Sequence, residues 1–60
     1  MLMKYRNKKT GEIYRVLAFG VDKANSRDGM PVVIYTPDSE HVIYVREQVE
    51  FELKFEEVEE

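Results

Sequence analysis

The sequence predicts a mainly β fold: a small SH3-like barrel or a strongly bent antiparallel sheet of about five strands, with a 3-10 turn or short helix near the C-terminus. Residues 32–35 and 42–45 are two runs of β-branched and aromatic side chains, and residues 37–40 between them are turn formers, which is typical of a β-hairpin. Residues 12–21 form a longer run of the same kind. That density of β-branched and aromatic residues favours a strand over a helix there.

The first strand of the predicted sheet lies near the N-terminus. Residues 3–7 alternate apolar and polar side chains, so Met3 and Tyr5 should face inward. Residues 8–11 then form a turn in which Gly11 supplies a positive φ angle. Together with the run that follows, this segment predicts an N-terminal hairpin.

Between the two predicted hairpins lies the longest loop, residues 22–30. It contains several turn-forming residues and two basic ones, Lys23 and Arg27. Long loops on small domains often carry binding residues. We therefore expect this loop to contribute to any ligand site.

The C-terminal segment has two readings. We prefer a 3-10 turn over residues 47–50, a closing strand over residues 51–55 and a frayed acidic end at residues 56–60. An acidic C-terminal helix is the alternative, because apolar residues also recur there at helical spacing. The chain is thus expected to form one β domain, residues 1–55, followed by an acidic tail.

Both faces of the predicted strands are apolar, which leaves the register open. A one-residue shift would exchange the faces of every strand. A domain of this size has one interior, so the second apolar face should be covered by the C-terminal segment, another subunit or a ligand. The expected interior consists of Tyr5, Val16, Ala18, Val33, Ile43, Val45 and Phe51, or the set shifted by one residue.

The amino-acid composition excludes some kinds of functional site and shows how charge is distributed along the chain. The chain of 60 residues has no cysteine and one histidine, so it can form no disulfide or cysteine-based metal site, and we expect no cofactor. Residues 1–46 carry eight Lys/Arg against five Asp/Glu, a balance of +3, whereas residues 47–60 carry seven Glu against one Lys, a balance of −6. The body is therefore mildly basic and the tail acidic.

Catalytic motifs are poorly represented. Residues 38–41 gather carboxylate, hydroxyl and imidazole groups, but they are adjacent, and neighbouring side chains of an extended chain point apart. A polar turn explains them, and no nucleophile elbow or phosphate-binding glycine loop occurs elsewhere. We expect a protein that is not an enzyme.

Binding is better supported, because arginine pairs with phosphates or carboxylates and tyrosine stacks on a base. Both residue types are also ordinary on small β-surfaces, where tyrosine is partly core and arginine is solvated. Arg15, between two apolar residues, should need a partner, either a tail glutamate of another subunit or a bound anion. The candidate ligand-binding residues are Tyr5, Arg6, Tyr14, Arg15, Arg27, Tyr35, Tyr44 and Arg46.

Several short motifs are spread over nearly the whole chain: Tyr5-Arg6, Lys9-Thr10-Gly11, Tyr14-x-Val16-Leu17, Tyr44-Val45-Arg46-Glu47 and Glu50-Phe51-x-x-Lys54-Phe55. Together they resemble a family of small bacterial and phage proteins catalogued as a domain of unknown function. The sequence departs from the family pattern at Asn7, where the family has histidine. The resemblance implies no established activity. A weaker resemblance, resting on size and the second apolar face, is to small phage proteins that sequester nucleotide immune signals between subunits without cleaving them.

Three functions follow as hypotheses. The first is a non-enzymatic homo-oligomer, most simply a dimer, that sequesters a small anionic nucleotide-like ligand. The second is a protein-interaction module acting on a host or phage protein. The third, nucleic-acid binding through the basic segment 4–9, is disfavoured by a pI near 5.1. No signal-peptide or membrane-spanning pattern occurs, so we expect a cytoplasmic location, the host cytoplasm if a phage encodes the protein.

Overall fold

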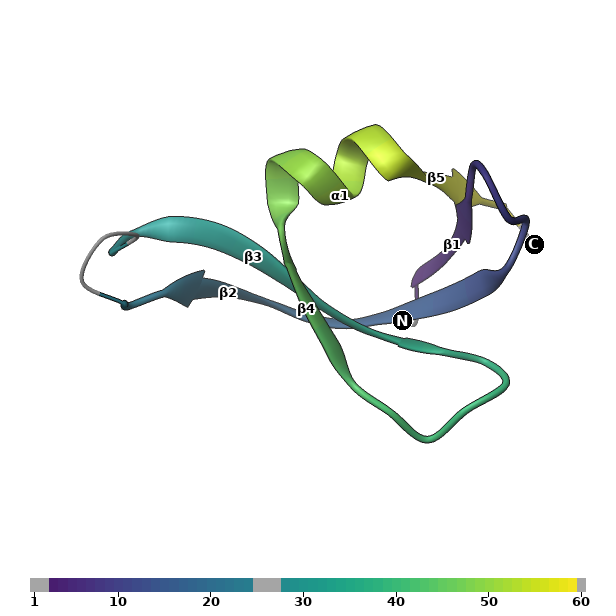
Figure 1. The fold of residues 1–60 in the computed structure, drawn as a ribbon, viewed down its shortest axis with the longest axis horizontal. Helices are drawn as coiled ribbons and strands as arrows, with labels where there is room; N and C mark the ends of the chain where they lie inside the picture. The colour runs from purple at the N-terminus through teal and green to yellow at the C-terminus, as the bar shows by residue number, and fades with distance from the viewer. Residues whose placement is uncertain (1–2, 25–27, 60) are drawn as a thin grey trace.

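A computed structural model describes residues 3–24 and 28–59. It contains one antiparallel sheet of five strands in the order β4-β3-β2-β1-β5, with one short helix between β4 and β5 (Figure 1). The predicted mainly β fold is confirmed as a bent, open sheet, because β4 and β5 lie at its two ends and do not pair. The elements are β1 (Met3–Asn7), β2 (Ile13–Asp22), β3 (Met30–Pro37), β4 (Tyr44–Glu47), α1 (Gln48–Lys54) and β5 (Phe55–Val58).

The two predicted hairpins are present. β1 pairs with β2, and Gly11 in the turn between them has a φ of 80°, as expected. β3 pairs with β4, with Tyr35 opposite Tyr44. The long loop is shorter than predicted, because β2 and β3 pair as far as Asp22 and Met30. Residues 25–27 of that loop lie outside the described residues.

The C-terminal segment differs from the preferred prediction. Residues 48–54 form an α-helix, and the closing strand follows at Phe55–Val58 instead of residues 51–55. Burial explains the difference: Phe51 and Phe55 are buried, whereas Val49 and Leu53 are exposed. That is the four-residue period of a helical face and not the alternation of a strand. The expected boundary between domain and tail, at residue 56, falls within β5.

The core lies between α1 and one face of the sheet, which we call the inner face (Figure 1). Tyr35, 3% exposed, contacts both Phe51 and Phe55, with ring centroids 5.0 and 5.4 Å away. The rings of Phe51 and Phe55 stack on each other at 4.4 Å. The buried cluster consists of Val16, Val33, Tyr35, Phe51 and Phe55, with Met3, Tyr5 and Tyr14 packed against it.

A β-bulge in β2 decides which residues reach this core. Val16 pairs with Tyr35 and Ala18 pairs with Ile34, so Leu17 is an extra residue without a partner in β3. The bulge exchanges the faces of all later residues of β2. Phe19 therefore shares the inner face with Val16, although strict alternation would place them on opposite faces.

The bulge and the pairing of β3 with β4 correct the predicted interior. Tyr5, Val16, Val33 and Phe51 are inward as expected, but Ala18, Ile43 and Val45 are exposed. Ala18 lies after the bulge and so faces outward. Val45 is opposite Ile34, which shares the outer face, and is 63% exposed.

No helix in the part of the chain that the structure describes is long and apolar enough to cross a membrane.

Candidate functional site

The four tyrosines predicted to hold a ligand gather on the inner face, where they form much of the aromatic packing. Tyr14 and Tyr44 contact Tyr35, with ring centroids 5.5 and 5.6 Å away, and Tyr5 contacts Phe51 at 5.0 Å. Tyr35 is buried and Tyr5 and Tyr14 are half-buried, whereas Tyr44 is 40% exposed. Their rings therefore pack edge-on or tilted against one another and against phenylalanines.

Burial also affects how two of these tyrosines ionise. It raises the pKa of Tyr5, and the negative charges of Glu57 and Glu52 raise it further. Burial likewise raises the pKa of Tyr14, with a smaller contribution from Glu12. Both phenols stay neutral to higher pH than a free tyrosine does, because the phenolate would lose hydration and meet like charge.

The predicted arginines are distributed over both faces of the sheet. Arg6, on the outer face of β1, binds Glu56 of β5, with Nη2 2.8 Å from Oε2. Arg15, on the outer face of β2, binds Asp38 at 2.8 Å. The partner expected for Arg15 from another subunit or an anion is thus supplied by the turn that follows β3. Arg27 lies outside the described residues.

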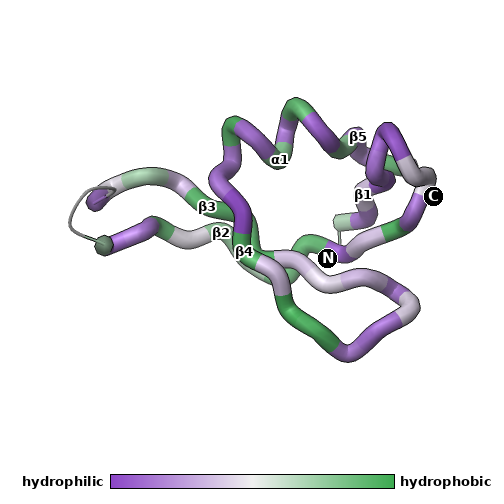
Figure 2. The backbone as a smooth tube through the Cα atoms, viewed as in Figure 1, coloured by the Kyte–Doolittle hydropathy of each residue, from purple (hydrophilic) through white to green (hydrophobic). Residues whose placement is uncertain are grey.

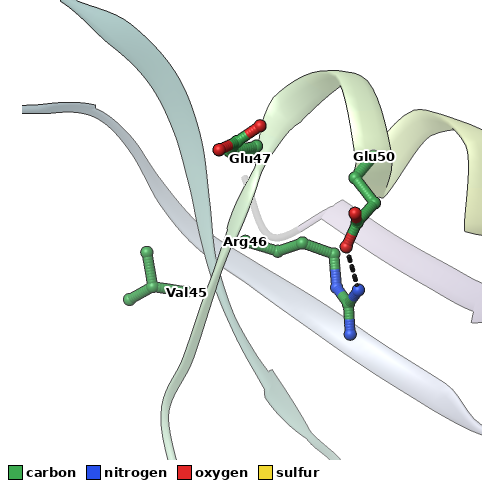
Figure 3. A pocket seen from close by; sticks show the side chains of 4 residues that line it. All are labelled: Val45, Arg46, Glu47 and Glu50. Atoms are coloured by element: carbon green, nitrogen blue, oxygen red, sulfur yellow. Dashed lines mark hydrogen bonds and ion pairs between the residues drawn. The ribbon is translucent and has the colours of Figure 1, made fainter. Parts of the chain in front are cut away.

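Arg46 is the predicted arginine that lies with the tyrosines. Its Nε donates a hydrogen bond to the hydroxyl of Tyr35 at 3.1 Å, and its Nη1 pairs with Glu50 in the first turn of α1. Figure 3 shows Arg46 pointing toward Glu50, while Val45 points to the other side of the strand. The bond with Tyr35 raises the pKa of Arg46, burial opposes that shift, and Glu50 adds to the rise.

Two pockets adjoin Arg46. One, about 470 Å³, lies along β4 and the start of α1 (Figure 3) and is lined by Val45, Arg46, Glu47 and Glu50. Its two carboxylates outnumber its one guanidinium, so it does not suit an anion. The other, about 360 Å³, lies between the β1–β2 turn and the end of α1. Its lining residues are Asn7, Lys8, Lys9, Thr10, Arg46, Leu53 and Lys54.

The second pocket is held in shape by the turn. The Asn7 side chain accepts hydrogen bonds from the backbone N–H groups of Lys9 and Thr10, at 2.8 and 3.1 Å. The Lys8 N–H donates to the Lys54 carbonyl at 3.0 Å, which joins the turn to the end of the helix. These bonds fix the backbone from which Lys8, Lys9 and Lys54 extend.

The charges of this pocket are unbalanced. Within residues 3–24 and 28–59, no carboxylate forms an ion pair with Lys8, Lys9 or Lys54. Thr10 Oγ1 accepts a hydrogen bond from the backbone N–H of Glu12 at 3.2 Å, so its own hydrogen can donate outward. Ammonium groups and a hydroxyl around one hollow are suited to an anion. We call Lys8, Lys9, Thr10 and Lys54 the lysine pocket.

Comparison with protein-family models, curated proteins and solved structures finds no match for this chain. The resemblance to a family of small bacterial and phage proteins therefore stays a prediction.

Groups suited to metal binding are not gathered in the described residues. No cluster of three or more His, Cys, Asp or Glu side chains that could hold a metal ion occurs there. The polar turn at residues 38–41 is exposed, and Asp38 within it is paired with Arg15.

Sequence reasoning identified part of the lysine pocket in a different grouping. It placed Lys8 and Lys9 in one basic segment with Lys4 and Arg6, but the structure puts the latter two on the outer face of β1. Lys54 was not singled out. It could have been noticed because it is the one basic residue in a segment, residues 47–60, that contains seven glutamates. Its proximity to Lys8 depends on the return of β5 to β1, which sequence spacing does not reveal.

Proposed function

We propose that this protein is a non-enzymatic, oligomeric binding protein that sequesters a small anionic, nucleotide-like ligand, and that the lysine pocket holds the ligand's anionic group. The supporting observation is the set of three lysines around one pocket without carboxylate partners among the described residues. A phosphate would receive charge-assisted hydrogen bonds from the ammonium groups and the Thr10 hydroxyl.

An apolar residue beside the lysines supports the proposal that the ligand is nucleotide-like. Leu53 lines the same pocket and is 71% exposed, so it can cover one face of a base or sugar while the lysines hold the phosphate. Tyr44 is exposed, but it does not line this pocket. The family resemblance adds a bacterial or phage source to the same proposal. The cytoplasmic location, expected from the sequence pattern, is part of the proposal as well.

Titration calorimetry with pyrophosphate, ADP and adenosine tests this function. Pyrophosphate and ADP should bind saturably, and uncharged adenosine should bind far more weakly. Lys8→Gln and Lys54→Gln should each weaken ADP binding about tenfold, because one charged hydrogen bond is lost. Added salt should weaken binding as well.

Lys23→Gln is the matched control, because it also removes one lysine charge. Lys23 lies in the loop after β2 and pairs with Asp28 at 2.9 Å. Its removal should leave ADP affinity unchanged. Equal losses of ADP affinity in all three variants would mean that binding depends only on the net charge of the protein, which would contradict a specific site. Absence of binding by both pyrophosphate and ADP would also contradict the proposal.

A second candidate is a protein-interaction module, and it rests on a different surface. Phe19 and Val21 of β2 are each 56% exposed although they share the inner face with the core. Both belong to the second half of β2, and the β2–β3 hairpin extends past α1 (Figure 1). A partner that covers them should lose affinity when Phe19 is replaced by serine, without any change in ADP binding by the variant.

A further inference from the structure

The two open edges of the sheet differ sharply in charge. An edge strand presents unpaired backbone groups that can bind another strand. β5 carries the adjacent glutamates Glu56 and Glu57, so two copies of β5 would bring like charges together. β4 has one arginine and one glutamate among its four residues and is neutral overall. The β4 edge is therefore the one suited to a second copy of the chain.

Symmetry limits how two β4 strands can pair. A two-fold axis that relates antiparallel neighbours in one continuous sheet is perpendicular to the sheet, so one residue must lie opposite itself. With Arg46 on the axis, two guanidinium groups would face each other. With Val45 on the axis, Tyr44 lies opposite the partner's Arg46, and a cation can contact a ring. Charge thus favours the arrangement centred on Val45.

The local structure also favours Val45 over Tyr44 as the centre. Pairing centred on Tyr44 would extend through residues 42–43, which precede β4. The carbonyl of Val42 already accepts a hydrogen bond from Thr36 Oγ1 at 2.6 Å. Pairing centred on Val45 needs the residues on either side of it, and both belong to β4.

Apolar side chains on the outer face also favour the arrangement centred on Val45. Ala18, Ile34 and Val45 lie side by side across β2, β3 and β4 on the outer face. Val45 is 63% exposed at the end of this row, and the segment that leads into β4 is hydrophobic (Figure 2). A second copy related by the axis would continue the row with its own Val45, Ile34 and Ala18.

We propose that β4 pairs antiparallel with β4 of a second copy, with Val45 opposite the partner's Val45, to form a two-fold symmetric dimer with a continuous sheet. This inference specifies the interface of the oligomer in the proposed function. Anion binding at the lysine pocket does not depend on it, so the two can be tested separately.

Disulfide cross-linking tests the register, because the chain has no cysteine of its own. Val45→Cys should form a covalent dimer under mild oxidation, since directly opposite Cβ atoms in an antiparallel pair lie within disulfide reach. Tyr44→Cys alone should not. A mixture of Tyr44→Cys and Arg46→Cys should cross-link to each other. Leu53→Cys, at a site 71% exposed on α1, gives the background of random collision.

Sedimentation equilibrium tests the dimer without cross-links. Val45→Lys should convert the dimer to a monomer, because two lysines would meet at the axis. Val49→Lys is the matched control: Val49 is 65% exposed, against 63% for Val45, but lies on α1. It should remain dimeric. Circular dichroism should show both variants folded, and ADP calorimetry reports separately on the lysine pocket.

The opposing outcomes are distinct. A wild-type monomer at high concentration, a dimeric Val45→Lys variant, or cross-linking of Val45→Cys no faster than the Leu53→Cys background would each overturn the β4 interface. Longer chains of subunits would instead indicate β4 pairing with β5, which also contradicts it. If no dimer forms but ADP still binds, the β4 interface is wrong and the proposed anion site is unaffected.

Discussion

At the scale of single residues, the hydrogen bond between Arg46 and Tyr35 connects a surface strand to the core. Tyr35 is 3% exposed, and its hydroxyl accepts the Arg46 Nε–H. A buried hydroxyl that loses its partner carries a desolvation cost. Arg46 thus stabilises the fold as well as lining both pockets.

The first prediction concerns this pair. Arg46→Gln should lower the free energy of unfolding by about 1–3 kcal/mol, because it leaves the Tyr35 hydroxyl without its donor. Tyr35→Phe, which removes the hydroxyl itself, should cost less, and the double variant should cost less than the sum. Urea denaturation of all three variants measures the coupling. Arg15→Gln, which breaks an exposed pair, should cost under about 1 kcal/mol.

The second prediction follows from the raised pKa values of Tyr5 and Tyr14. Well below pH 10.0, the ordinary tyrosine pKa, both phenols are protonated in the folded and unfolded states and contribute no pH dependence. Above it the unfolded chain loses those protons first, so the free energy of unfolding falls as pH rises through the folded-state pKa values. Urea denaturation at increasing alkaline pH should show this decline.

The comparison variant for the alkaline decline carries Tyr5→Phe and Tyr14→Phe together. Phenylalanine keeps the rings and removes the ionising groups, so its curve should be flatter than that of the wild type. A decline of identical slope in both proteins would assign the alkaline loss to other groups.

At the scale of elements, the bulge at Leu17 sets the inner face of β2. The observed pairing passes from Val16–Tyr35 to Ala18–Ile34 and skips Leu17. Removal of Leu17 would therefore leave every other β2 residue opposite its present partner and on its present face. This is unusual for a deletion within a strand, because a one-residue shift normally exchanges faces.

The third prediction is that the chain folds with Leu17 deleted, at a loss of about 1–2 kcal/mol for the altered twist and packing. Deletion of Ile34, in the unbulged strand β3, should unfold the protein, because it moves Val33 or Tyr35 out of the core. Circular dichroism and urea denaturation of the two deletions measure the contrast. If both deletions unfold the chain, the bulge is itself required for the fold.

The fourth prediction concerns α1. Phe51 is 2% exposed and contacts Tyr35 and Phe55, so Phe51→Ala should cost about 3–5 kcal/mol, enough to unfold much of so small a domain. Val49→Ala, on the exposed side of the same helix, should change stability by under about 0.5 kcal/mol. Thermal denaturation followed by circular dichroism distinguishes them.

These elements show which parts of the fold could be predicted from sequence. The hairpins could, because turn residues and β-branched runs act locally, and Gly11 has the expected positive φ. The bulge could not, because Leu17, Ala18 and Phe19 are all apolar and pairing with β3 decides which of them is extra. The helix over residues 48–54 was predicted only as the alternative to a 3-10 turn and a strand. Phe51 and Phe55 fit both the two-residue alternation of a strand and the four-residue spacing of a helical face, so the sequence pattern could not decide between them.

The candidate site was less predictable than the fold. The predicted tyrosines lie on one face of the sheet, and Tyr5, Tyr14 and Tyr35 pack in or against the core, a role that composition cannot separate from stacking on a ligand. Arg15 was expected to need a partner outside the chain, and Asp38 supplies one at a position that depends on strand pairing. The lysine pocket joins residues 8 and 54, whose contact is a product of the tertiary fold.

At the scale of the whole molecule, size and assembly are linked. A chain of 60 residues buries a small core, here a single cluster with α1 over one face of the sheet. Extra surface burial between copies stabilises folded protein by mass action. The β4 dimer would supply such burial without enlarging the chain.

The fifth prediction is therefore that the melting temperature rises with protein concentration. Folding and association are coupled in a dimer, so a higher concentration favours the folded state. Differential scanning calorimetry at two concentrations should show the shift for the wild type and for Val49→Lys, and no shift for Val45→Lys. A melting temperature independent of concentration in the wild type would count against coupled association.

The pairing of β5 with β1 has a consequence for how the protein is made. Lys4 lies opposite Val58, and Phe55 completes the aromatic cluster, so β1 cannot complete its pairing until β5 has been synthesised. Until then the nascent chain exposes its apolar strands, and the core forms only after β5 has emerged. Folding of this domain is thus expected to end with the long loop closure that joins β5 to β1.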